Sequence, residues 1–372
     1  MKKKYIVTPW EVSGEIDYDK LIEEFGLKKI DDKLIDRIKE HTGELHPLIK
    51  RKFFFAHRDL DWILDEYEKG NKFFLYTGRG PSGDTHLGHL VPWILTKWLQ
   101  DKFDVELWFQ MTDDEKFYFK EDLSIEDTNS FAYDNALDVI ALGFKENKTY
   151  IFSDFDYART LYREAAKVAK KLNFSTVRAV FGLDESSNVG KIFFTCMQSV
   201  PAFLPSIKYG KNIPCLIPHA VDQDPHFRIS RDILPKLGFY KPASIQSMFL
   251  PGLLKGGKMS SSIKESAIFI SDSDNEVDKK IKNAFTGGRD TLKEQKEKGG
   301  RPEICMVFNY FNVLFMWDDK ELNEIKERCK SGGILCGECK KILSERVKKF
   351  LNEHRKKRED AKKKLNKFIL KD

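Results

Sequence analysis

Long hydrophobic runs are missing from this sequence. No stretch of its 372 residues reaches the length of about 20 apolar residues with which a helix crosses a bilayer. The basic start of the chain continues into a short apolar run that Pro9 and Glu11 interrupt, which is not the pattern of a secretory signal. We therefore expect a protein without a membrane-spanning segment that works in the cytoplasm.

Cysteine is also scarce, with six residues in the whole chain. So few cysteines in a long chain argue against a disulfide framework and for a reducing compartment. Apolar residues make up 41% of the sequence, which is enough to bury cores and excludes a chain that is disordered throughout. A chain of 372 residues is long for one core and predicts at least two domains.

Apolar, β-rich runs alternate with helix-like segments from Phe73 onward. Such alternation is typical of a parallel sheet in an α/β fold, and about five strands fit one doubly wound sheet. We expect a Rossmann-like domain over 71–265, with inserted helices at about 157–206, between an added N-terminal segment (1–70) and a helical C-terminal domain (266–372). The five runs are FFLYTG, VELWFQMT, TYIFSDF, IPCLIPHAV and SIQSMFL.

The added N-terminal segment carries two amphipathic patterns. Asp17 and Asp31 precede these patterns at the position of an N-cap, and Gly26 and Gly43 follow them. The sequence therefore predicts two short helices before the sheet.

Two histidines, His86 and His89, follow the first strand-like run and a glycine-rich turn. A metal pair is the weakest interpretation, because H-x-x-H lacks the glutamate of H-E-x-x-H. An ordinary helix start is the second. The third is a phosphate site, in which the N-terminus of a helix beginning near Gly88 faces the ligand and the imidazoles donate hydrogen bonds to an oxyanion.

A lysine-led, serine-rich loop near the end of the sheet pattern favours the phosphate interpretation. In GGKMSSS, two glycines precede Lys258, Met259, Ser260 and Ser261. A glycine-hinged loop with a cation and hydroxyls can close on a pyrophosphate leaving group. Alone the loop is equally well a solvated turn. Together with HLGH in the same α/β domain, it predicts nucleotide chemistry.

HLGH and KMSSS resemble the HIGH and KMSKS signatures of class I aminoacyl-tRNA synthetases, with Ser261 where the second lysine usually stands. Further segments are similar to tryptophanyl-tRNA synthetases of the archaeal and eukaryotic type: PWEVSG, IDYDKLIEEFG, YTGRGPSG, FQMTDDEK, CLIPHAVDQDPHFR and FTGGRDT. The resemblance extends from about Trp10 to about Lys349. It implies an ATP-dependent tryptophan–tRNA ligase with a Rossmann-like catalytic domain, an α-helical anticodon-binding domain and a homodimeric assembly.

The resemblance also implies roles for individual residues. Tryptophan would be bound by Tyr76 and Gln110 at the indole N–H, Glu115 and Gln198 at the ammonium group, Lys116 at the carboxylate, and Gln223 at the backbone groups. ATP would be bound by Arg79, Gly80, His86, Gly88, His89, Asp222, Lys258, Met259, Ser260 and Ser261. A glutamine inside an apolar run needs a partner, which supports Gln110 and Gln198 independently, whereas Tyr76 can equally be a packing residue.

The implied reaction needs no side-chain nucleophile. The tryptophan carboxylate attacks the α-phosphate of ATP, and the adenylate then acylates the terminal ribose of tRNA(Trp). Catalysis is by positioning and charge stabilisation, with His86 and His89 on the transition state and Lys258 on the departing pyrophosphate. We expect Mg²⁺ to accompany ATP, although the sequence shows no dedicated carboxylate cage for it.

The C-terminal tail is rich in Lys and Arg and suits an RNA backbone, except that the last residues are equally well a solvated helix face. We prefer the solvated face for about the last fifteen residues. The resemblance places anticodon contacts at Arg289 and Asp290, and the basic tail adds Lys340 and Lys341. Arg and Asp side chains can both read the edges of unpaired bases.

Four cysteines in the C-terminal part form a C-x₂₃-C-x₆-C-x₂-C pattern: Cys305, Cys329, Cys336 and Cys339. A close C-x-x-C pair with two further thiols is a ligand set for a [4Fe–4S] cluster or for zinc. A subset of tryptophanyl-tRNA synthetases carries a cluster on a very similar spacing. The alternative is four buried or helix-start cysteines in a reduced cell, and both interpretations stay open.

Three other functions remain possible from the sequence. The nearest is a tyrosyl-specific relative on the same fold. A small-molecule adenylyltransferase also uses an H-x-G-H turn, but the basic tail and KMSSS argue against it. The last is an RNA-binding or regulatory paralogue, against which the intact His86, His89 and Lys258 argue.

Overall fold

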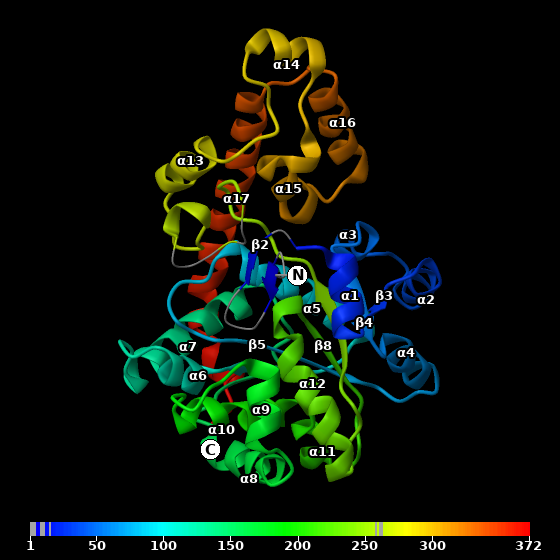
Figure 1. The fold of residues 1–372 in the computed structure, drawn as a ribbon, viewed down its shortest axis with the longest axis vertical. Helices are drawn as coiled ribbons and strands as arrows, with labels where there is room; N and C mark the ends of the chain where they lie inside the picture. Colours follow the sequence, from blue (N-terminus) through cyan, green and yellow to red (C-terminus); the bar gives the residue numbers. More distant parts are fainter. Residues whose placement is uncertain (1–4, 8–11, 15, 257–258, 260–262) are drawn as a thin grey trace.

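The computed structural model describes the chain except residues 1–4, 8–11, 15, 257–258 and 260–262. Figure 1 shows a broad lower body, in which helices surround a sheet, and a narrower helical upper part. The long helix α17 (Cys336–Lys362), drawn in red, runs from the upper part down along the lower body. Among the described residues, none of the helices has both the length and the apolar character to cross a bilayer.

All five predicted strands are present, and they are parallel to one another in consecutive positions of a seven-stranded sheet, with β7 at one edge. Their spatial order is β9 (Ala243–Ser247), β8 (Cys215–Ala220), β5 (Phe74–Arg79), β6 (Leu107–Met111) and β7 (Thr149–Ser153). β5 lies between β8 and β6, so the strand order reverses at β5. In open α/β sheets, ligands bind beyond the carboxyl ends of the strands at such a switch point.

The first seventy residues contribute to the same sheet. β4 (Phe54–Arg58) pairs antiparallel with β9, and β3 (Lys28–Lys29) pairs antiparallel with β4 at the edge. The remaining elements of this stretch are β1 (Tyr5–Val7), β2 (Val12–Gly14), α1 (Tyr18–Phe25), α2 (Asp32–Thr42), α3 (Pro47–Lys50) and α4 (Leu60–Glu68). The segment expected as an addition therefore supplies two strands of the central sheet, while its domain boundary remains a prediction.

The two predicted N-terminal helices are confirmed with their caps. The side chains of Asp17 and Asp31 accept hydrogen bonds from the backbone N–H groups of Lys20 and Leu34 in the first turns of α1 and α2. Gly26 and Gly43 end the helices at φ values of 64° and 75°, in the left-handed region that glycine adopts readily.

Two cores cover the two faces of the sheet. Alternate residues of β5 point to opposite faces: Leu75 packs in a core with α5 (Leu87–Phe103), and Phe74 and Tyr76 pack in a core with the inserted helices. The insertion is helical, as predicted, and consists of α8 (Ala158–Ala169), α9 (Phe174–Phe181), α10 (Val189–Met197) and α11 (Leu204–Tyr209). The other helices of this body are α6 (Asp113–Phe119), α7 (Ile125–Ala141) and α12 (Asp224–Ile233).

The part of the chain beyond Ile270 is helical up to Lys362, as predicted. Its helices before α17 are α13 (Asp274–Lys282), α14 (Leu292–Lys298), α15 (Met306–Tyr310) and α16 (Asp319–Lys330). A short π-helical turn, Phe311–Phe315, follows α15.

The end of the chain differs from the expected solvated helix face. Phe368 is 3% exposed, and Ile369 forms a parallel bridge with Ile151 of β7. The N–H of Ile151 donates to Phe368 at 2.8 Å, and the N–H of Leu370 donates to Ile151 at 2.8 Å. The expectation was wrong here because the edge of β7 pairs with the end of the chain through backbone groups. Pairing of backbone groups does not depend on a side-chain pattern, so no sign of it is visible in the sequence.

Candidate active site

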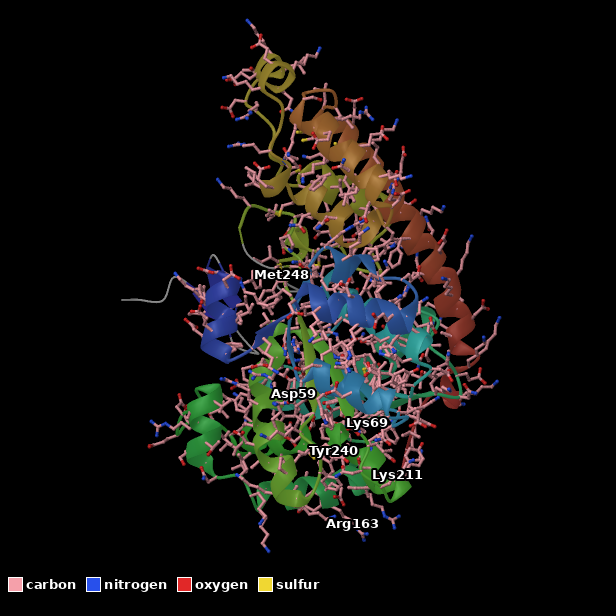
Figure 2. The ribbon with its side chains drawn as sticks, turned by 90° about the vertical axis from the view of Figure 1, so that its right-hand side faces the viewer. Asp59, Lys69, Arg163, Lys211, Tyr240 and Met248 are labelled. Atoms are coloured by element: carbon pink, nitrogen blue, oxygen red, sulfur yellow. The ribbon has the colours of Figure 1, made fainter. Side chains whose placement is uncertain are left out.

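A cleft of about 440 Å³ opens beyond the carboxyl ends of β5, β6 and β8, where the switch point predicts it. Its volume lies in the range of small-molecule sites. Met248, one of the lining residues, is labelled in Figure 2, where it lies between the lower body and the helical upper part. The predicted site residues that line the cleft are Arg79, Gly80, His86, Gly88, His89, Glu115, Lys116, Gln198, Asp222, Gln223 and Met259.

The remaining predicted residues fall into two groups. Tyr76 and Gln110 are both 0% exposed and are not among the described residues that line the cleft, but hydrogen bonds connect them to Gln198, which lines it. Lys258, Ser260 and Ser261 lie outside the described residues.

The HLGH segment forms the N-terminus of α5 on one side of the cleft. His86 is the N-cap, and its ring stacks on that of His89, with ring centroids 3.5 Å apart. The backbone N–H of His86 donates to Nδ1 of His89 at 3.2 Å, so a neutral His89 carries its proton on Nε2. The N–H of Gly88 donates to the sulfur of Met259 at 3.3 Å, so the two motifs that the sequence separates meet here.

Arg79 extends from the end of β5 beside this helix start. Its Nε and Nη2 atoms are buried and have no hydrogen-bond partner among the described residues. Burial lowers the pKa of Arg79 to about 10, although Glu115 and Asp138 oppose the shift. A buried cationic donor without an acceptor is suited to an anionic ligand.

Glu115 and Lys116 form an ion pair at 2.8 Å on the first turns of α6. Burial raises the pKa of Glu115, but Lys116 and a hydrogen bond from Thr112 outweigh it, and the pKa is lowered. A Cβ atom at Gly80 would come within 2.2 Å of the Lys116 side chain and 2.7 Å of Glu115. Glycine at this position therefore allows the pair to approach the strand end.

A buried chain of hydrogen bonds starts at Gln198 in the lining of the cleft. Nε2 of Gln198 donates to the Tyr76 hydroxyl at 2.8 Å, and that hydroxyl donates to Oε1 of Gln110 at 2.5 Å. Nε2 of Gln110 lies 2.9 Å from each carboxylate oxygen of Asp154. Burial raises the pKa of Tyr76 well above its usual range, so the hydroxyl keeps its proton as a donor.

Sequence reasoning missed several residues of the cleft. Asp154 follows β7 and is 1% exposed, and an acidic residue just after a strand's end is the signal that points to it. His226 lines the cleft, and burial lowers its pKa to about 4. Tyr18 of α1 accepts a hydrogen bond from the N–H of Phe249, a lining residue, and no local pattern reveals that contact.

The four cysteines of the C-terminal pattern line one small pocket of about 20 Å³ in the upper part of the molecule. Burial, and then the neighbouring thiols, raise the pKa of Cys329 to about 11 and of Cys339 to about 12. Cβ atoms at Gly288 and Gly300 would lie 2.7 and 2.8 Å from two of the sulfurs, so glycines leave room beside them. Within the described residues, no three His, Cys, Asp or Glu side chains are arranged to hold a single metal ion.

The predicted anticodon residues lie near this pocket and away from the cleft. Arg289 follows the two glycines that line the pocket, and its Nε donates to the carbonyl of Gly299 at 2.9 Å. Asp290 and Lys341 are exposed. Lys340 donates to the carbonyl of Lys282 at 2.7 Å, and burial lowers its pKa.

Comparison with known proteins gives a consistent result. The family model described as tRNA synthetases class I (W and Y) matches residues 68–352. The tryptophan–tRNA ligases of Thermococcus kodakarensis and Pyrococcus furiosus are each 52% identical to this chain, covering 97% and 99% of it and 93% and 94% of their own lengths. The crystal structure of Plasmodium falciparum tryptophanyl-tRNA synthetase superposes with a TM-score of 0.90 at 40% identity, covering 95% of this chain and 97% of that one.

Proposed function

The chain belongs to the class I tryptophanyl-tRNA synthetases and is an ATP-dependent tryptophan–tRNA ligase, and from this premise we propose which residues carry the reaction. One observation supports the assignment above the others. The lining of a single cleft includes both the amide-rich start of α5 with Arg79 and Gln198, from which a buried hydrogen-bond chain leads to Tyr76 and Gln110. The first group suits phosphates, and the second suits an indole.

In the first step, the tryptophan carboxylate attacks the α-phosphate of ATP in line, and pyrophosphate leaves. His86 and His89 donate hydrogen bonds to the phosphate oxygens as charge develops, and Arg79 pairs with the phosphates. Lys258 would neutralise the departing pyrophosphate. Gly80, Gly88, Met259, Ser260 and Ser261 complete the ATP site, and Asp222 binds the ribose. Mg²⁺ accompanying ATP would supply further positive charge at the phosphates.

The amino acid occupies the other half of the cleft. Glu115, with Gln198, binds the ammonium group, and Lys116 binds the carboxylate. Gln223 binds the backbone groups. Tyr76 and Gln110 accept the indole N–H, so an amino acid without that donor leaves buried acceptors unpaired.

In the second step, the adenylate acylates the terminal ribose of tRNA(Trp). Arg289, Asp290, Lys340 and Lys341 contact the anticodon from the upper part of the molecule. The enzyme acts as a homodimer in the cytoplasm. Its catalytic and anticodon domains have the boundaries 71–265 and 266–372.

ATP–pyrophosphate exchange with each amino acid in turn tests the substrate. We expect exchange with tryptophan and none above background with tyrosine. Tyrosine-dependent exchange would instead favour the tyrosyl-specific relative. Light scattering of the purified protein tests the dimer, and a mass of one chain would contradict it.

We also propose that Cys305, Cys329, Cys336 and Cys339 hold a [4Fe–4S] cluster. Four thiols around one pocket are a ligand set for such a cluster. When bound, the cluster would cross-link the segments that carry these cysteines and would take no part in aminoacylation.

Iron and sulfide analysis of anaerobically purified protein tests the cluster. Cys339→Ser should lose the iron–sulfur absorbance, whereas Cys196→Ser, which alters a buried cysteine outside the pocket, should keep it. If the analysis instead finds one zinc per chain, the four cysteines form a zinc site and the cluster proposal is wrong. A colourless, metal-free and fully active preparation would end both interpretations.

A further inference from the structure

Gln110 sits fully buried on β6, between a donor on one side and an acceptor on the other. Its Oε1 accepts from the Tyr76 hydroxyl at 2.5 Å, and its Nε2 lies 2.9 Å from both carboxylate oxygens of Asp154. A glutamine amide has a donor end and an acceptor end of nearly the same shape. Its neighbours therefore decide which end points toward the cleft.

Asp154 selects the orientation of this amide. A half-turn of the amide would set Oε1 against the oxygens of Asp154 and Nε2 against Tyr76. Oε1 of Gln110 and the facing oxygen of Asp154 would then have no proton between them. Leaving both acceptors unpaired in a site closed to water costs free energy. The carboxyl group therefore holds the Nε2 end of Gln110, and Oε1 stays toward Tyr76.

Asp114 keeps Asp154 an acceptor toward Gln110. The two carboxyl groups are hydrogen-bonded. Burial, and then the charge of Asp113, raises the pKa of Asp114 to about 7, although the hydrogen bond with Asp154 opposes the shift. Burial, and then the charge of Asp114 and the hydrogen bond with it, raises the pKa of Asp154 well above its usual range. Such a pair holds a proton between its members. That proton is directed at Asp114, so the lone pairs of Asp154 remain available to Nε2.

We propose that Asp154 is a positioning residue for the choice of amino acid, fixing the Gln110 amide so that Oε1 rather than Nε2 faces the indole N–H. The proposal rests on the tryptophan site proposed above. Asp154 acts through Gln110, because it is 1% exposed and holds the Gln110 amide through both carboxylate oxygens. With the amide reversed, the indole N–H would meet a second donor.

The test compares tryptophan with β-(benzothiophen-3-yl)alanine, in which sulfur replaces the indole N–H. The readout is the ratio of kcat/KM for the two substrates in ATP–pyrophosphate exchange. Asp154→Ala should lower this ratio about tenfold, mainly by raising KM for tryptophan. Without Asp154 the Gln110 amide can turn either end toward the substrate and no longer favours the indole N–H. Asp154→Asn should keep it within about twofold, since the amide oxygen accepts from Gln110 while the NH₂ group donates to Asp114.

Two further variants separate the possible outcomes. Asp156→Ala, two residues away and hydrogen-bonded to Tyr133 instead, should keep the wild-type ratio. If Gln110→Ala leaves the ratio unchanged, the tryptophan site itself is wrong. If Gln110→Ala lowers the ratio but folded Asp154→Ala does not, or if Asp154→Asn loses as much as Asp154→Ala, the role of Asp154 is overturned.

A measurement on the unaltered enzyme covers the case in which Asp154→Ala does not fold. The chain contains six glutamines, so ¹⁵N-glutamine labelling gives few side-chain amide signals. The Gln110 amide protons should exchange slowly with water. Their chemical shifts should change little when tryptophan binds, because they remain hydrogen-bonded to Asp154. Rapid exchange, or a large shift on binding, would contradict the proposal.

Discussion

The two halves of the cleft satisfy their polar groups in opposite ways. In the half proposed to bind the amino acid (the amino-acid half), each member of the chain Gln198, Tyr76, Gln110 and Asp154 has a partner in the ligand-free protein. In the half proposed to bind phosphates (the phosphate half), two buried nitrogen atoms of Arg79 have none among the described residues. One half is complete before substrate arrives, and the other becomes complete with an anion.

The difference separates selectivity from catalysis. A preformed hydrogen-bond chain can reject a wrong amino acid because any mismatch leaves buried groups unpaired. Unpaired donors raise the free energy of the empty site. That cost is relieved when the donors bind the phosphates, on which negative charge develops during the reaction. The substitutions and the change of pH described next each alter one half of the cleft, and the measurements show whether the function of the other half changes.

The largest effect is expected from His89→Ala in the phosphate half. We expect tryptophan-dependent ATP–pyrophosphate exchange to fall about a hundredfold, as when an oxyanion donor is removed, while equilibrium binding of tryptophan stays unchanged. Lys258→Ala should lose a similar factor. His41→Ala, on the distant helix α2, is the matched control and should exchange normally. Wild-type exchange by His89→Ala would remove the catalytic role of His89.

A smaller effect is expected on the unfolding free energy when the pH is lowered, because two buried histidines of the amino-acid half are then protonated. Burial lowers the pKa of His226, as of its neighbour His219, to about 4 from 6.5. Protonation therefore favours the unfolded chain, and the stabilisation present above pH 6.5 is lost as the pH falls toward 4. Between pH 7 and pH 5 each histidine should cost about 2 kcal/mol of unfolding free energy.

Urea unfolding at pH 7 and pH 5 measures this loss. His226→Gln removes one titrating group and should shrink the difference between the two pH values by the share of one histidine. An unchanged difference would show that His226 is already charged or exposed in the folded protein.

The smallest effect is expected for Arg79→Leu, and its sign is the informative part. Removing a buried cation without a hydrogen-bond partner should raise the unfolding free energy of the ligand-free protein by about 1 kcal/mol, while ATP no longer stabilises it. Arg37→Leu is the control, because Arg37 is paired with Asp65 and Glu68 and its loss should destabilise the protein. Destabilisation by Arg79→Leu would mean that Arg79 already has its partner.

Patterns that are local in the sequence predicted most of the fold and of the phosphate half. The five parallel strands follow from apolar runs, and the start of α5 follows from glycines and a helical period. The edge strand Lys28–Lys29 is exposed and has no apolar pattern, so it could not be predicted. Tertiary pairing of backbone groups placed it in the sheet.

Long-range partners explain what the sequence left open in the site. The resemblance implied Gln110, and the need of a buried amide for a partner supported it, but Asp154 stands 44 residues further along the chain. Nothing in the spacing links the two. Likewise the cysteine spacing left both a cluster or zinc site and four separate buried cysteines open, whereas the folded geometry places all four around one pocket.

The bridge between Ile369 and Ile151 makes the last residues of the chain the outer border of the sheet. A purification tag fused to the C-terminus would start at this border, and deletion of a few terminal residues would uncover the backbone of β7. An uncovered border of this kind recruits strands from other molecules. For expression and engineering, the C-terminus is therefore best left as it stands.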